Sequence, residues 1–82
     1  MYNIVFTNRS IKDLENLSPE VKTRIITKLK EYLPNPFDYC TKLSDTKLGT
    51  YRFRIGEYRV IFDLDGTTLV ILRIGHRKEI YK

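Results

Sequence analysis

The stretch that decides the fold runs from Tyr51 to Phe62 and reads YRFRIGEYRVIF. In its first half, apolar residues alternate with two arginines, which is the period of a β-strand that has one apolar and one basic face. Its second half takes up the same period. Gly56-Glu57 between the halves is a two-residue turn with glycine first, as a type II′ hairpin requires. The stretch therefore predicts two antiparallel strands.

The pattern continues into a third strand. Asp65-Gly66 predicts a type I′ turn, and residues 68–74 then form a run that is apolar on both faces. A strand that is buried on both faces lies inside a sheet and not at its edge. Residues 51–74 therefore predict an antiparallel meander of three strands.

The first forty residues predict a strand followed by two helices. Residues 2–7 are rich in β-branched and aromatic side chains, as strands are. Ser10 stands three residues before Asp13, which is the pattern of a helix N-cap with an acid in the first turn. A second helix starts at residues 18–20, Ser-Pro-Glu, and ends at Pro34, whose ring blocks continuation. Its apolar stripe consists of Val21, Ile25, Ile26, Leu29 and Leu33.

These elements predict an α+β fold in a single domain, residues 1–82. We expect a small antiparallel sheet, made of the N-terminal strand and the three-strand meander, with both N-terminal helices packed on one face. Residues 35–49 have no clean period and are expected to form a partly packed connector. Because the helices cover the apolar face of the hairpin, strand parity leaves Arg52, Arg54 and Arg59 on the open face.

The composition excludes several classes of protein. Cys40 is the single cysteine and His76 the single histidine, so the chain can form neither a disulfide framework nor a zinc site of its own. The longest apolar run, residues 69–72, is far too short to cross a bilayer, and the N-terminus lacks the pattern of a signal peptide. We therefore expect a soluble, cytoplasmic protein with no metal, no cofactor and no membrane partner.

The net charge of +5 is concentrated toward the C-terminus, where five of the seven arginines lie. Arginine presents a rigid, permanently charged fork that suits phosphate. Residues two apart on a strand lie roughly 6.5–7 Å from each other, close to the spacing of phosphates along a nucleic-acid strand. The open face, with Arg73 on the third strand, is predicted to bind nucleic acid or an acidic partner, unless the charge serves only solubility. Beyond a glycine that permits a bend, His76, Arg77 and Tyr81 can reach back over this face.

Two motifs, taken together, resemble a known family. The block Y-R-x-R-x-G-x-Y-R at residues 51–59 and the tail G-H-R at residues 75–77, followed by Tyr81, closely resemble the RelE/ParE toxin superfamily, and its RelE branch most of all. The resemblance covers essentially the whole chain, since the order of elements also matches. It implies the toxin of a toxin–antitoxin system. RelE-type members cleave mRNA in the ribosomal decoding site and are silenced by a tightly bound antitoxin.

The resemblance also implies the residues of a site. Those implied in catalysis are Arg52, Arg54, Arg59, Arg77 and Tyr81, and those expected to hold RNA phosphate are Arg52, Arg54, Arg73 and His76. RNA cleavage without a metal ion needs a 2′-hydroxyl to attack the adjacent phosphate, and preorganised arginines stabilise the charge that develops. Arg59 and Arg77 are predicted to do this. Tyr81 is expected to stack on a base or to transfer a proton.

One departure from the family pattern concerns the general base. RelE-type enzymes commonly carry lysine where this chain has Arg52 or Arg54, and arginine effectively cannot lose its proton. Either His76 takes that role, because histidine titrates near neutral pH, or the protein is a slow nuclease whose rate comes from electrostatics and substrate orientation.

Three functions remain open at the level of sequence. The first is a ribosome-dependent endoribonuclease acting on mRNA, the second a ParE-like toxin that inhibits a topoisomerase, and the third an inactivated member that binds only an antitoxin or RNA. The combination of Arg59, Arg77 and Tyr81 favours the first. The expected protein partner is an acidic, partly disordered antitoxin that folds on binding. DNA is expected to be reached only through that antitoxin.

Overall fold

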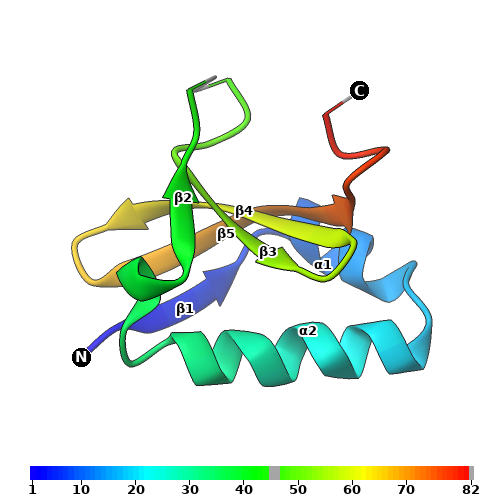
Figure 1. Cartoon of the computed structure of the whole chain (residues 1–82), viewed down its shortest axis with the longest axis horizontal. Helices are drawn as coiled ribbons and strands as arrows, with labels where there is room; N and C mark the ends of the chain where they lie inside the picture. The colour runs from blue at the N-terminus through cyan, green and yellow to red at the C-terminus, as the bar shows by residue number, and fades with distance from the viewer. Residues whose placement is uncertain (45–46, 82) are drawn as a thin grey trace.

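The computed structural model describes residues 1–44 and 47–81, and it has two helices packed on one face of a five-stranded sheet (Figure 1). The α+β class expected from the sequence is confirmed. In chain order the elements are β1 Asn3–Phe6, α1 Asn8–Glu15, α2 Pro19–Tyr32, a 3₁₀ turn Pro36–Asp38, β2 Cys40–Lys42, β3 Tyr51–Ile55, β4 Tyr58–Asp65 and β5 Thr68–His76. Neither helix within residues 1–44 and 47–81 is long and apolar enough to cross a membrane.

The sheet has the strand order β1-β5-β4-β3-β2 and is mixed. The predicted antiparallel meander of β3, β4 and β5 is confirmed, and β5 lies inside the sheet as expected. β1, however, pairs with β5 in parallel, so the expectation of an all-antiparallel sheet is wrong at this edge. The direction of β1 relative to β5 depends on how the intervening chain turns back in space. Parallel strands must be joined by a long crossover connection. The path of that connection in space cannot be read from any local sequence pattern.

β2 is an edge strand that the sequence analysis did not predict. It pairs antiparallel with β3, from Cys40 opposite Phe53 to Lys42 opposite Tyr51. Three residues are too few to show a period of two, so the strand is defined by its partner and not by its own pattern. The rest of the expected connector contains the 3₁₀ turn Pro36–Asp38 and is otherwise irregular in the residues described, and positions 45–46 of it lie outside them.

The two hairpin turns both place a glycine in the left-handed region. Gly56 has a φ of +59° and Ile55 pairs with Tyr58, which confirms the two-residue turn predicted there. The predicted Asp65-Gly66 turn is displaced by one residue, because Asp65 pairs with Thr68 and the turn is Gly66-Thr67. A type I′ turn needs positive φ at both turn residues. Only the glycine, with a φ of +62°, adopts it here.

The helix starts show one correct and one incorrect prediction. α2 begins as expected, with the Ser18 side chain accepting a hydrogen bond from the Val21 amide at 3.4 Å. α1 is capped by Thr7 and not by Ser10. The Thr7 hydroxyl accepts from the Ser10 amide at 3.2 Å, and the buried Ser10 hydroxyl donates to the Thr7 carbonyl at 2.9 Å. Both residue types cap helices, so the identity of the cap depends on where the chain leaves β1.

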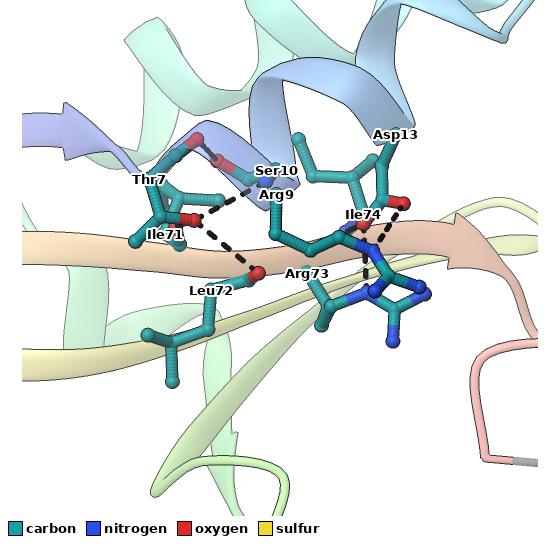
Figure 2. A network of polar contacts seen from close by, with 8 residues as sticks. All are labelled: Thr7, Arg9, Ser10, Asp13, Ile71, Leu72, Arg73 and Ile74. Carbon is teal, nitrogen blue, oxygen red and sulfur yellow. Dashed lines mark hydrogen bonds and ion pairs between the residues drawn. The ribbon is translucent and has the colours of Figure 1, made fainter.

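α1 lies beside β5 beyond the end of β1 and satisfies polar groups on that edge (Figure 2). The Thr7 hydroxyl donates to the Ile71 carbonyl at 2.9 Å. The Asp13 carboxylate accepts from the Ile74 amide at 3.0 Å and from Arg73 Nε at 2.8 Å. α1 and its N-cap therefore supply hydrogen-bond partners to main-chain groups along the edge of β5 near and beyond the end of β1.

The core lies between the helices and the sheet. Its buried members are Ile25, Leu29, Phe53, Ile55, Val60, Phe62, Leu69, Ile71 and Ile74. On the other face, Ile61 is fully buried, and Gly49 packs so closely against it that an added Cβ would lie 2.6 Å from the Ile61 side chain. Asp63 accepts hydrogen bonds from the amide and hydroxyl of Thr50, each at 2.8 Å. The connector thus covers part of this face.

Candidate functional site

A basic hollow of about 450 Å³ lies on the face of the sheet opposite the helices. It is open to solvent and is lined by Arg52, Arg54, Arg59, Arg77, Lys78 and Tyr81. β3, β4 and the segment after β5 supply these side chains. We call it the arginine hollow. All five residues implied in catalysis by the family resemblance line it.

Strand register accounts for the grouping of the sheet arginines. Arg54 lies directly opposite Arg59 in the ladder between β3 and β4, and Arg52 lies opposite Ile61. Paired residues project from the same face of a sheet. The predicted placement of Arg52, Arg54 and Arg59 on one face is therefore confirmed.

Arg59 is buried, which strand parity alone did not predict. Only 5% of the residue is exposed, so the expectation of a solvent-facing side chain on an open face is wrong for Arg59. Its Nη1 atom donates to the carbonyls of Gly56 and Tyr58, both at 2.9 Å, which holds the guanidinium against the hairpin turn. Burial lowers the pKa of Arg59, and the positive charge of Arg54 adds to this effect. Arginine still remains charged near neutral pH.

Arg54 differs from Arg59 in being exposed. Among the described residues, no hydrogen bond or ion pair holds its guanidinium. Two like charges directly opposite each other on neighbouring strands repel. A bound anion between them would remove this repulsion.

Arg52 and Tyr81 join the sheet to the C-terminal segment. Arg52 Nη1 donates to the Tyr81 hydroxyl oxygen at 2.8 Å. The Nε atom of Arg52 is buried and has no hydrogen-bond partner. An unpaired buried donor costs free energy in the free protein. The bond to Arg52 leaves the hydroxyl proton of Tyr81 available to another acceptor.

The segment after β5 is anchored by Ile80. This side chain is 2% exposed and packs over Gly75, where an added Cβ would meet it at 3.6 Å. The amide of Ile80 donates to the His76 carbonyl at 3.0 Å. The anchor folds the chain back, so that Arg77, Lys78 and Tyr81 border the hollow.

Two predicted phosphate contacts do not line the hollow. Arg73 pairs instead with Asp13 on α1, as Figure 2 shows. His76 lies opposite Tyr58 in the ladder, on the helix-covered face. The two rings meet edge to face, with their centroids 5.4 Å apart. The Nδ1 atom of His76 accepts from the Lys78 amide at 3.1 Å. His76, one of the two alternatives considered for the missing general base, is therefore not among the side chains of the hollow.

Lys78 is a lining residue that the sequence analysis missed. Its position directly after Arg77 in the tail motif was the available signal, but only the fold of the segment shows that both border the hollow. Unlike a guanidinium, its amine can exchange a proton.

The hollow can bind and stabilise negative charge, because four guanidinium groups and an ammonium group converge on it. No group of three His, Cys, Asp or Glu side chains that could hold a metal ion occurs in the described part of the chain. A second hollow of about 370 Å³ lies between the N-terminus and the end of α2, lined by Met1, Tyr2, Lys30, Leu33 and Pro34. It is mainly apolar and brings no set of charged groups together.

Known proteins resemble this chain along nearly its whole length. The family model described as ParE toxin of type II toxin-antitoxin system, parDE, matches residues 4–81. Toxin RelG of Mycobacterium tuberculosis is 31% identical, over 99% of this chain and 97% of its own. The toxin–antitoxin complex RelBE2 of M. tuberculosis has a chain of TM-score 0.77 and 30% identity, which covers 93% of this chain and 98% of that one. The archaeal RelE-RelB complex of Pyrococcus horikoshii gives a TM-score of 0.75 at 25% identity, with 95% and 97% covered. The chain belongs to the RelE/ParE family and is the toxin of a type II toxin–antitoxin system.

Proposed function

We propose that this toxin is an endoribonuclease that cleaves mRNA on the ribosome, by attack of a 2′-hydroxyl on the adjacent phosphate. The observation that carries the proposal is the convergence of four arginines, Lys78 and the Tyr81 hydroxyl on one hollow. During such an attack, the phosphate passes through a pentavalent state with added negative charge. Cations fixed beforehand at that position stabilise this state more than the ground state.

The paired arginines suit different steps. Arg59 is buried and held by two carbonyls, so its guanidinium is already oriented before the substrate arrives. A positive charge that is already in place stabilises the negative charge that develops on the phosphate in the transition state. Arg54 is exposed and unpaired among the described residues, which suits it to hold a phosphate of the incoming strand. Arg77 borders the same hollow and adds a second cation near the reacting phosphate.

The proton transfers fall to Lys78 and Tyr81, the two lining groups that are not arginines. Lys78, through its neutral amine, takes the proton of the 2′-hydroxyl as the bond from O2′ to phosphorus forms. Tyr81, whose oxygen accepts from Arg52, donates its own proton to O5′ as the bond from phosphorus to O5′ breaks. The products are a 2′,3′-cyclic phosphate and a 5′-hydroxyl.

The partners follow from charge and from the relatives. Two similar structures are complexes of a toxin with its antitoxin. We propose that this chain likewise binds an acidic, partly disordered antitoxin, since its net charge is +5 and its basic hollow is open. A ribosomal substrate implies a cytoplasmic location, and DNA is contacted only through the antitoxin.

Mapping of RNA ends tests the chemistry. Purified toxin is added to ribosomes programmed with a defined mRNA, and the products of a single turnover are analysed. We expect 2′,3′-cyclic or 3′-phosphate ends and 5′-hydroxyl ends, at a rate that chelators leave unchanged once ribosome integrity is controlled for. Products with 5′-phosphate ends would mean that water was the nucleophile, and would contradict the proposal.

A second candidate is inhibition of a topoisomerase, because the matching family model is that of ParE toxins. Pulse labelling after induction in bacteria separates the two. Protein synthesis stops first if mRNA is the target, and DNA synthesis stops first if a topoisomerase is. An inactivated member stops neither.

A further inference from the structure

The turn between β3 and β4 contacts two arginines of the hollow that come from different elements. Arg59 Nη1 donates to the carbonyls of Gly56 and Tyr58, at 2.9 Å each. The Arg77 amide donates to the Glu57 carbonyl at 2.8 Å, and Arg77 Nε lies 2.6 Å from Glu57 Oε2. Three consecutive residues of the hairpin thus hold the two arginines that are proposed to stabilise the reacting phosphate.

The contact between Glu57 and Arg77 is made twice, once by main chain and once by side chain. The hydrogen bond from the Arg77 amide to the Glu57 carbonyl follows directly after the last pair of the β4–β5 ladder, Tyr58 and His76. It therefore fixes the position of the Arg77 main chain at the end of β5. The carboxylate then engages the guanidinium at Nε. This leaves the two terminal nitrogens of Arg77 for an anion, because an arginine that pairs through Nε keeps them available.

The ion pair is exposed, with 52% of the Arg77 side chain and 61% of the Glu57 side chain accessible. An exposed pair contributes little to folding stability. Its effect is therefore expected on the orientation of the arginine and not on the stability of the fold. Gly56, with a φ of +59°, makes the tight turn that brings Glu57 beside the end of β5.

We infer that Glu57 is a positioning residue, which orients the Arg77 guanidinium toward the arginine hollow. The inference rests on the proposed nuclease function for its kinetic consequence, but the orientation itself is a property of the free protein. Glu57 does not line the hollow and is not expected to touch the RNA.

The kinetic test compares Glu57→Gln with wild type in single-turnover cleavage. We expect the maximal rate to fall about tenfold, less than the roughly 100-fold that a 1 Å misplacement of a catalytic group can cost, while the RNA concentration that gives half the maximal rate does not rise. Glu57→Asp keeps the charge and is expected to recover part of the rate. In an Arg77→Ala background, Glu57→Gln is expected to have no further effect, because Glu57 acts through Arg77.

Asp65→Asn is the matched control. Asp65 is an exposed acid next to the other two-residue turn of β4, so its replacement makes the same change of net charge away from the hollow. We expect this variant to cleave at the wild-type rate. A Glu57→Gln protein that also cleaves at the wild-type rate would overturn the inference, as would an equal loss in both variants.

A second measurement does not depend on cleavage. Nitrogen-15 relaxation at the arginine Nε–H groups of the free protein reports how far each guanidinium is restrained. We expect Arg77 to be more restrained than Arg54 in wild type, and as mobile as Arg54 in Glu57→Gln. If the wild-type protein cleaves no RNA, the proposed function fails while this measurement still decides the inference. Equal mobility of the two arginines in wild type would overturn it.

Discussion

Arg54 and Arg59 lie directly opposite each other on β3 and β4, yet one is exposed and the other is 5% exposed. Their charges repel across the ladder. Two carbonyl groups of the turn hold Arg59 in place, whereas no hydrogen bond or ion pair within the described residues holds Arg54. We therefore expect an anion bound in the arginine hollow to offset this repulsion and to stabilise the fold.

Substitution of Arg59 separates folding from chemistry. Arg59→Ala removes a buried stem and two hydrogen bonds, so we expect a loss of about 1–2 kcal/mol in the free energy of unfolding. Arg59→Met keeps most of the apolar stem, and its free energy of unfolding is expected to lie within about 1 kcal/mol of the wild-type value. Both variants should cleave RNA roughly 100-fold more slowly, on the scale of a lost oxyanion donor. Urea unfolding and single-turnover cleavage measure the two effects, and a methionine variant that cleaves normally would contradict the assignment.

Substitution of Arg54 tests the repulsion. We expect Arg54→Gln to stabilise the free protein by about 0.5 kcal/mol, because one of two opposed charges is removed. We also expect phosphate or sulfate to raise the melting temperature of wild type more than that of the variant, since specific anion binding stabilises the folded state. Thermal unfolding over a series of anion concentrations measures both. Lys12→Gln, which removes an exposed positive charge on α1, is the matched control and is expected to show neither effect.

Asp13 gives the fold a dependence on acid pH. Burial raises the pKa of its carboxyl, but the hydrogen bonds from Arg73 and from the Ile74 amide outweigh this, so the net pKa lies below 3.8. A group with a lowered pKa stabilises the fold above its ordinary pKa, and this stability is lost as the pH falls through the lowered value. We therefore expect wild-type stability to decline below about pH 4.

The Asp13→Asn variant is expected to lack that part of the decline. At pH 7 it should be less stable than wild type by about 1.5–3 kcal/mol, the usual range for a hydrogen bond to a charged group. Urea unfolding between about pH 2.5 and pH 7 measures both. Glu15→Gln, an exposed acid on the same helix, is the control. If Asp13→Asn had the same acid profile as wild type, the ion pair with Arg73 would not be the source of the dependence.

Lys78 is predicted to be the proton acceptor of the hollow. Lys78→Arg keeps the positive charge but replaces an amine, which can exchange a proton, by a guanidinium, which effectively cannot. We expect its cleavage rate to fall by about 100-fold, within the range for a lost general base, while RNA affinity is kept. Lys78→Ala is expected to lose affinity as well. Single-turnover rates measured across pH test this, and a Lys78→Arg rate equal to wild type at every pH would leave electrostatics and substrate orientation as the origin of the rate.

The sequence was sufficient to predict those parts of the fold that depend on neighbouring residues. The alternation in residues 51–62 predicts both strands, their turn and the face on which each arginine lies, because side chains alternate strictly along a strand. The start of α2 is likewise local, since a serine cap and a proline in the first turn act within one turn of helix. The grouping of Arg52, Arg54 and Arg59 follows from these local rules.

Contacts between distant segments were decided only by the tertiary structure. The parallel pairing of β1, the strand β2 and the capture of Arg73 by Asp13 each join segments that no local period relates. The same holds for the site. Arg59 is buried and held by the carbonyls of the turn, and His76 lies on the helix side because β5 pairs it with Tyr58. Lys78 reaches the hollow because the chain folds back at Ile80. Periodicity is a property of adjacent residues, whereas burial and pairing depend on what the rest of the chain brings alongside them.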